Sequence, residues 1–285
     1  ADDPLLAAAH RADADAATGV VPSGRTTEEA RMSGPLLQLT GVTLRFGGLT
    51  AVSSVTADVK EGELAGLIGP NGAGKTTLFN LITGVYQPTE GRIEFAGAGT
   101  AGVKPFHLTE RGIARTFQNI ELFEAATVLD NLLLGRNRFF QGHWWQQVLH
   151  TPALARLEEE ARAEVETVID FLDLTAWRNA PISGLPYGVR KVVELGRAIC
   201  TKPELLFLDE PASGLNPEET RDLAFWIDDI RKELGITVVM VEHDMSLVSA
   251  VADRVICMAQ GRILAEGTAA EVQSNPSVVS AYLGA

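Results

Sequence analysis

Apolar and polar residues alternate or cluster in a pattern that predicts a mixed α/β domain beginning near Leu36. Alternating stretches are typical of strands with one buried face, and short apolar runs are typical of strands buried on both faces. Such strands are expected at residues 36–46, 53–60, 64–69, 204–210 and 237–243, with Val55, Ala57 and Val59 on one face of the second. Residues 254–267 predict a hairpin that turns at Gln260 and Gly261.

Helical spacing replaces this alternation in the middle of the chain. From Leu157 to Leu172, apolar residues recur at the spacing of one helix face, which predicts an amphipathic helix. An aromatic cluster precedes it, made of Phe139, Phe140, Trp144 and Trp145. The cluster is expected to anchor an inserted helical subdomain or, alternatively, to contact a partner.

Composition and charge narrow the class of protein. Residues 1–34 are poor in large apolar side chains, which predicts a mobile, solvated tail before a domain at residues 35–285. No apolar run approaches the roughly 18 to 20 residues of a membrane span, and the acidic start is unlike a secretory signal, so a cytosolic location is expected. The net charge of −13 argues against a general nucleic-acid binder. Cys200 and Cys257 are expected to be ordinary core residues.

An anion-binding loop is predicted directly after the apolar run at residues 64–69. Residues 69–76 match the pattern G-x-x-x-x-G-K-[ST] and lead into a helix. Glycines let the backbone turn its N–H groups toward phosphates, and the helix start adds a positive dipole end. Lys75 is expected to reach the β- and γ-phosphates, and the Thr76 hydroxyl to ligate Mg²⁺; the alternative is a glycine turn that binds nothing. The predicted nucleotide-binding residues of this segment are Gly69, Pro70, Asn71, Gly72, Ala73, Gly74, Lys75, Thr76 and Thr77.

Two carboxylates end the apolar run at residues 204–210. Successive side chains of a strand point to opposite faces, so Asp209 and Glu210 can serve different roles. Asp209 is expected to hold Mg²⁺ through its water shell, and Glu210 to reach an attacking water. The alternative is that both acids merely solvate the end of the strand.

These features stand within a longer series of motifs, and with it the chain resembles the ATP-binding subunits of ABC transporters over nearly its whole length after the tail. The motifs are RFGG with Phe46, ARTFQNI with Gln118, LPYGVRKVVELGRAI from Leu185, FLDEPASGLNP with Asp209, and VMVEHD with His243. The resemblance implies a P-loop NTPase (RecA-like) core with an antiparallel β subdomain. It also implies an α-helical subdomain inserted at approximately residues 119–200 and a C-terminal helix at approximately residues 268–285.

The resemblance also implies roles for single residues. Phe46 would stack on adenine, Gln118 would ligate Mg²⁺ and orient water, and His243 would contact the γ-phosphate; core packing for Phe46 and a structural role for His243 are the alternatives. A signature segment would cap the ATP of a partner subunit, and it comprises Leu185, Pro186, Tyr187, Gly188 and Val189. A D-loop would follow Glu210, and it comprises Ser213, Gly214, Leu215 and Asn216. Two departures stand out, because the family's usual Leu-Ser-Gly-Gly-Gln has a serine at position 186 and its D-loop usually has Asp at position 216.

Within that family, the chain is most similar to ATPase subunits of branched-chain amino acid importers. The similarity lies in GIARTFQNIELF and in the ending EGTAAEVQSNPSVVSAYLGA. The partners implied are integral membrane permeases, a second ATP-binding subunit and, indirectly, an extracellular substrate-binding protein, which places the chain at the inner face of the membrane. The alternatives are an importer of urea or amides, a lipopolysaccharide-type exporter, and a soluble ABC ATPase.

Overall fold

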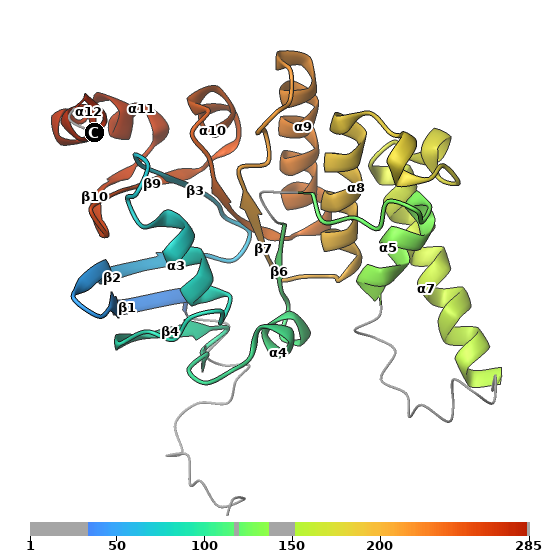
Figure 1. Ribbon diagram of the computed structural model, residues 1–285, viewed down its shortest axis with the longest axis horizontal. Helices are drawn as coiled ribbons and strands as arrows, with labels where there is room; N and C mark the ends of the chain where they lie inside the picture. Colours follow the sequence, from blue (N-terminus) through green and yellow to red (C-terminus); the bar gives the residue numbers. More distant parts are fainter. Residues whose placement is uncertain (1–33, 117–119, 137–151, 284–285) are drawn as a thin grey trace, which may run out of the picture.

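The protein is built around two β-sheets and the helices that flank them. The computed structural model describes residues 34–116, 120–136 and 152–283, and Figure 1 shows their arrangement. Within these residues one sheet has the strand order β10-β9-β3-β8-β7-β6 and the other the order β2-β1-β4-β5. The N-terminal tail and the aromatic cluster at residues 139–145 lie outside the described residues. The predicted P-loop NTPase fold is confirmed, with a mostly parallel sheet and a separate antiparallel one.

The first sheet forms the centre of the molecule. Its strands are β3 (Leu64–Ile68), β6 (Ile113–Arg115), β7 (Leu205–Asp209), β8 (Thr237–Val241), β9 (Arg254–Ala259) and β10 (Arg262–Gly267). β3 pairs in parallel with β8 and β9, and β7 pairs in parallel with β6 and β8. β9 and β10 form the expected hairpin, with Gln260 and Gly261 at positive φ in its turn.

Side chains of the central strands alternate between two cores. Leu205 and Phe207 of β7 join a core with the antiparallel sheet and α3 (Lys75–Ile82), whereas Leu206 and Leu208 join a core with the helices on the other face. All residues of β3, β7 and β8 are buried, as their uninterrupted apolar runs predicted. Cys200 and Cys257 are also buried, and burial raises the pKa of the Cys200 thiol to about 12.

The antiparallel sheet comprises β1 (Leu37–Phe46), β2 (Leu49–Val59), β4 (Glu90–Phe95) and β5 (Ala98–Gly99). β2 begins at Leu49, four positions before the predicted start at 53. The reason is a bulge at Ser54, which has a φ of 50° and shifts the register against β1. Val52 and Val55 both face the core because of this extra residue, so the strict alternation that sequence reasoning looks for is broken.

Further helices flank the sheets: α4 (Pro105–Glu110), α5 (Val128–Arg136), α7 (Pro152–Phe171), α8 (Tyr187–Cys200), α9 (Pro217–Leu234) and α10 (Met245–Val251). Two short 3₁₀ turns are η3 (Thr175–Trp177) and η4 (Ile182–Gly184). In Figure 1, α5 and α7 lie on the opposite side of the central sheet from β1, β2 and α3. The predicted amphipathic helix is α7, whose Val165 and Ile169 are fully buried. Leu157 departs from the prediction and is 46% exposed, because the N-terminal end of α7 extends beyond α5. Among the described helices, none is both long and apolar enough to cross a membrane.

The C-terminal segment was predicted as one helix, and this is wrong. It forms α11 (Ala269–Ser274) and α12 (Pro276–Leu283), separated at Asn275. Asn275 has extended backbone angles, with φ −70° and ψ 121°, as expected of a residue that precedes proline. Pro276 lacks an N–H group and therefore starts the second helix instead of continuing the first.

Replacing Gly135 with alanine is expected to lower the free energy of unfolding by about 1–3 kcal/mol. A Cβ at this position would lie 2.4 Å from the Arg197 carbonyl oxygen and 2.9 Å from the Cys200 Cβ, because α5 and α8 approach closely there. This overlap outweighs the gain of about 1 kcal/mol in helix propensity. Urea denaturation measures the difference, with Gly99→Ala as the control, since a Cβ at Gly99 meets nothing within 4 Å. Equal midpoints for Gly135→Ala and wild type would contradict the close packing.

Candidate functional site

The glycine-rich loop at residues 69–74 is closely enclosed by backbone. Gly69 has a φ of 147°, and a Cβ there would lie 2.1 Å from the Met258 carbonyl oxygen. Gly74 has a φ of 99°, and its Cβ would lie 2.7 Å from the Ala51 carbonyl oxygen. The turn of the β9–β10 hairpin holds the loop from one side, since the Gly261 N–H donates to the Ala73 carbonyl at 2.9 Å. Glycine is therefore required at both ends of this loop by space as well as by backbone angle.

Lys75 folds back onto the loop that precedes it. Its Nζ donates to the Gly69 carbonyl oxygen at 2.6 Å and to the Pro70 carbonyl oxygen at 3.1 Å. Burial lowers the pKa of Lys75, and the nearby carboxylates of Glu210 and Asp209 partly oppose that shift. The loop, its lysine and the two acids thus share one electrostatic environment, as the sequence predicted from their motifs.

Asp209 lies buried at the end of β7, on the face of the sheet that carries α3. Its Oδ2 accepts a hydrogen bond from Arg115 at 2.7 Å, and Arg115 also donates to the Asn80 side chain on α3 at 2.6 Å. Both partners of this ion pair are largely buried, so neither charge is screened by bulk solvent. Arg115 thereby connects β6, β7 and the helix after the glycine-rich loop. Sequence reasoning missed this residue, although a lone arginine at the end of an apolar strand needs a buried acid as its partner.

Glu210 follows Asp209 in a left-handed backbone conformation with a φ of 49°. Its N–H donates to the Val241 carbonyl oxygen of β8 at 2.9 Å, and its carbonyl accepts from the Ser213 N–H at 3.1 Å. A glutamate at positive φ is strained, and such residues are concentrated at functional sites. The turn therefore holds the Glu210 side chain in a direction that a regular strand would not give it.

A second buried acid, Glu242, organises the segment after β8. One of its oxygens accepts from the Ala212 N–H at 2.8 Å, and the other accepts from the N–H groups of His243 at 2.9 Å and Asp244 at 3.2 Å. The side chain of His243 is 65% exposed, with its Nδ1 3.8 Å from Glu242. Glu242 thus links the turn after Glu210, through Ala212, to the backbone of His243. The motif VMVEHD contains Glu242 but gave it no role, because its partner Ala212 lies thirty residues away in the chain.

Glu242→Gln is expected to lower the free energy of unfolding by about 1.5–3 kcal/mol, the usual contribution of a hydrogen bond to a charged group. Glutamine has an NH₂ group in place of one carboxylate oxygen, and this donor would face backbone N–H donors. The hydrogen bonds on that side are lost, so the turns at Ala212 and His243 are no longer held together. Urea denaturation measures the difference, with the exposed Glu233→Gln as control. A variant with wild-type stability would contradict the role given to Glu242.

The signature segment begins α8 without a side-chain cap. Leu185 is buried, and Pro186 occupies the N-cap position, where its ring offers no hydrogen-bond acceptor to the first turn. Pro186 therefore leaves the first turn of α8 without an N-cap side chain, at the positive end of the helix dipole. In Figure 1, α8 lies on the other side of β6 and β7 from α3, so the signature and the glycine-rich loop are separate within one chain.

The D-loop ends in the N-cap of α9. The Asn216 side chain accepts from the N–H groups of Glu218 at 2.9 Å and Glu219 at 3.0 Å, and the Glu219 carboxylate accepts from the Asn216 N–H. Asparagine and aspartate serve equally well at an N-cap. The substitution at position 216 is therefore accommodated without loss of the local structure.

Phe46 is 45% exposed at the end of β1, so its side chain is not packed in the core. Its ring meets Tyr86 edge-on, with centroids 5.3 Å apart and planes at 78°. An exposed face suited to stacking remains. Gln118 lies outside the described residues.

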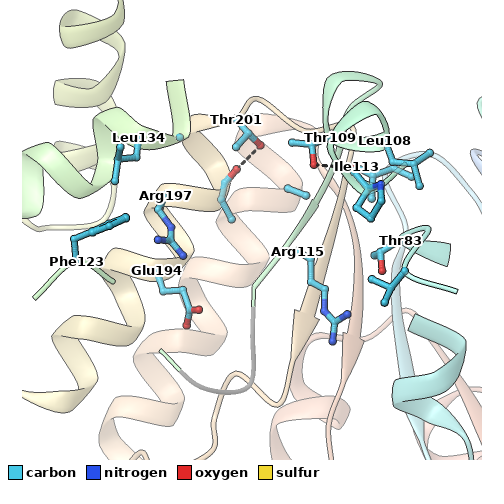
Figure 2. A pocket seen from close by; sticks show the side chains of 15 residues that line it. Thr83, Leu108, Thr109, Ile113, Arg115, Phe123, Leu134, Glu194, Arg197 and Thr201 are labelled. Carbon is cyan, nitrogen blue, oxygen red and sulfur yellow. Dashed lines mark hydrogen bonds between the residues drawn. The ribbon is translucent and has the colours of Figure 1, made fainter. Parts of the chain in front are cut away.

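A groove of about 410 Å³ separates the α3–α4 region from α5 and α8 (Figure 2). Figure 2 shows Phe123, Leu134 and Arg197 on one wall and Leu108 and Ile113 on the other. Val85, which also lines the groove, is an exposed apolar residue. An apolar groove with a few charged side chains is a suitable surface for a partner segment.

Comparison with known proteins agrees with this geometry. The family described as ABC transporter matches residues 52–213, and the family described as branched-chain amino acid ATP-binding cassette transporter matches residues 262–285. The chain is 42% identical over 253 residues to the high-affinity branched-chain amino acid transport ATP-binding protein BraF of Pseudomonas aeruginosa, covering 89% of this chain and 99% of that one. It is 41% identical to LivG of Escherichia coli K12 over the same coverage.

Solved structures give the same result. A crystal structure of an ATP-binding cassette of an ABC transporter in its ADP conformation superimposes with a TM-score of 0.78, at 32% identity, covering 89% of this chain and all of that one. A dimeric bacterial ABC transporter cassette superimposes with a TM-score of 0.68, at 25% identity, covering 82% of this chain and 98% of that one.

Proposed function

The chain belongs to the ABC transporter family and is an ATPase, and on that premise we propose that it powers an importer of branched-chain amino acids. The observation that carries the proposal is the enclosed glycine-rich loop with Lys75 directed into it, next to Asp209 and Glu210. The match of residues 262–285 to a branched-chain amino acid family, and the names of BraF and LivG, support the choice of substrate.

The phosphates of ATP bind to backbone N–H groups of the loop between Asn71 and Thr76, and Lys75 leaves the carbonyls of Gly69 and Pro70 to contact the β- and γ-phosphates. Phe46 stacks on the adenine. The strained turn at Glu210 directs its carboxylate toward the attacking water, whose proton it accepts. Glu242 holds His243 next to that turn, where its imidazole contacts the γ-phosphate.

The oxygen donors at the site suit a magnesium ion, which prefers hard oxygen ligands and retains much of its water. The Thr76 hydroxyl and the Asp209 carboxylate would hold the ion, and Gln118 would complete the set. Bound with ATP, Mg²⁺ supplies charge neutralisation at the phosphates. Arg115, paired with one oxygen of Asp209, keeps that carboxylate oriented.

Two protomers are needed, because the signature lies apart from the loop within one chain. In a head-to-tail pair with two-fold symmetry, the start of α8 caps the ATP held by the partner. The second protomer is another copy or a sister ATP-binding subunit, and the dimeric cassette similar to this chain supports the pairing.

The groove between α4 and α5 is the proposed contact for the integral membrane permeases. Their attachment would place the chain on the cytoplasmic face of the membrane, with an extracellular substrate-binding protein supplying the amino acid. Opening and closing of the ATPase pair would then move the permease helices.

Uptake of radiolabelled leucine tests the proposal. Cells that lack this chain should lose high-affinity uptake, the wild-type chain should restore it, and Lys75→Ala should not. Retained leucine uptake together with lost urea uptake would support the urea or amide importer, and retained uptake of both with defective lipopolysaccharide would support the exporter.

A further inference from the structure

Tyr187, the first residue of α8, contacts the D-loop of its own chain. Its hydroxyl donates to the Ser213 carbonyl oxygen at 3.3 Å. Its ring also occupies the space above Gly214, where a Cβ would come within 2.9 Å of the Tyr187 Cε1 atom. Gly214 has a φ of 81°, so both its conformation and its neighbour favour glycine. The aromatic ring of this signature residue thus lies against the D-loop.

The next residue makes a second link. Gly188 is buried, and a Cβ there would lie 2.4 Å from the Glu219 Oε1 atom. The other oxygen of Glu219 accepts from the Asn216 N–H at 2.9 Å and so closes the D-loop onto α9. Two adjacent residues of the signature therefore touch the middle of the D-loop and the residue that caps its end.

The contact contributes little to the core. Tyr187 is 46% exposed, its hydrogen bond is long, and other residues of α8, such as Val193 and Leu195, are buried in the core. The usual signature of the family has glycine at the position of Tyr187, which could not make this contact. A ring that contacts the D-loop from the signature without filling the core is expected to hold these two segments in a fixed relative position.

We propose that Tyr187 is a positioning residue that makes the signature and the D-loop move as one unit. The inference rests on the proposed function, in which the signature caps the ATP of the partner. Because Ser213 and Gly214 contact Tyr187, they lie on the same face as the signature and reach the partner with it. Closure over one ATP then carries the D-loop of the same protomer to the interface, which couples the two ATP sites.

Steady-state hydrolysis and ATP-dependent dimerisation test this. Tyr187→Gly should lower the Hill coefficient for ATP from near the two-site limit of about 2 toward about 1. In a Glu210→Gln background, Tyr187→Gly should weaken the ATP-bound dimer by about tenfold or more, and Tyr187→Phe, which keeps the ring, by about threefold. Affinity of the separate protomer for a fluorescent ATP analogue should stay within twofold of wild type, because the glycine-rich loop is untouched.

A double-mutant cycle with Gly214→Ala separates positioning from general damage. The added methyl group presses on the Tyr187 ring, so Gly214→Ala alone should lower cooperativity, and it should do so much less when Tyr187 is already glycine. Additive effects, or wild-type cooperativity in both Tyr187→Gly and Tyr187→Phe, would overturn the inference. If Tyr187→Gly fails to fold, Tyr187→Phe and Gly214→Ala decide the matter. A wild-type chain that neither hydrolyses ATP nor dimerises would instead overturn the proposed function, and this inference with it.

Discussion

Replacing Glu210 with glutamine is expected to lower ATP turnover by roughly 100- to 10,000-fold, the usual contribution of a general base. Glutamine has the same shape but cannot take a proton from water. The backbone hydrogen bonds of Glu210 to Val241 and Ser213 do not involve its side chain, so the strained turn should persist. ATP should therefore still bind, and the unhydrolysed nucleotide should hold two protomers together.

Phosphate release measures the turnover, and size-exclusion chromatography with ATP measures the dimer. Glu61→Gln, an exposed acid in another turn, serves as the control and should behave as wild type. If Glu210→Gln hydrolyses ATP at the wild-type rate, the residue is not the base, and another acid must activate the water.

Lys75→Ala is expected to weaken ATP binding by roughly 10- to 100-fold, since each hydrogen bond to a charged group contributes about 1.5–3 kcal/mol. The change removes the one ammonium group held inside the described loop, at 2.6 Å from the Gly69 carbonyl. The loop should keep its shape, because Gly69, Gly74 and the β9–β10 turn fix it. Isothermal titration calorimetry measures the affinity, with the exposed Lys60→Ala as control.

The same titration can also detect a change in the protonation of Lys75. Burial lowers the pKa of Lys75 in the free protein, and a bound phosphate raises it again. At alkaline pH, ATP binding to the wild type should therefore take up protons, which buffers of different ionisation enthalpy reveal. Lys75→Ala should lose this uptake; proton uptake equal to wild type would show that another group is responsible.

Local signals predicted much of the structure. The buried strands, the hairpin turn at Gln260 and the position of Lys75 after a strand all depend on residues close in sequence, where spacing and residue type are informative. Asp209 and Glu210 were found because the strand before them is uniformly apolar.

Features that depend on distant partners were not predicted. Arg115 on β6 meets Asp209 on the neighbouring strand β7, and Glu242 meets Ala212 between two loops, so neither segment alone identifies its partner. The bulge at Ser54 broke the alternation on which strand prediction rests. Likewise, the sequence gives no sign that Tyr187 contacts the D-loop, because this contact depends on how α8 packs against it.

The self-contact of Lys75 has a consequence for which nucleotides the protein accepts. Its ammonium group already donates hydrogen bonds to the Gly69 and Pro70 carbonyl oxygens, so an incoming nucleotide must replace these acceptors with phosphate oxygens. A nucleoside monophosphate stops short of the β-position and cannot complete that exchange, which leaves the lysine on its own backbone. We therefore expect the loop to bind AMP more weakly than ADP or ATP.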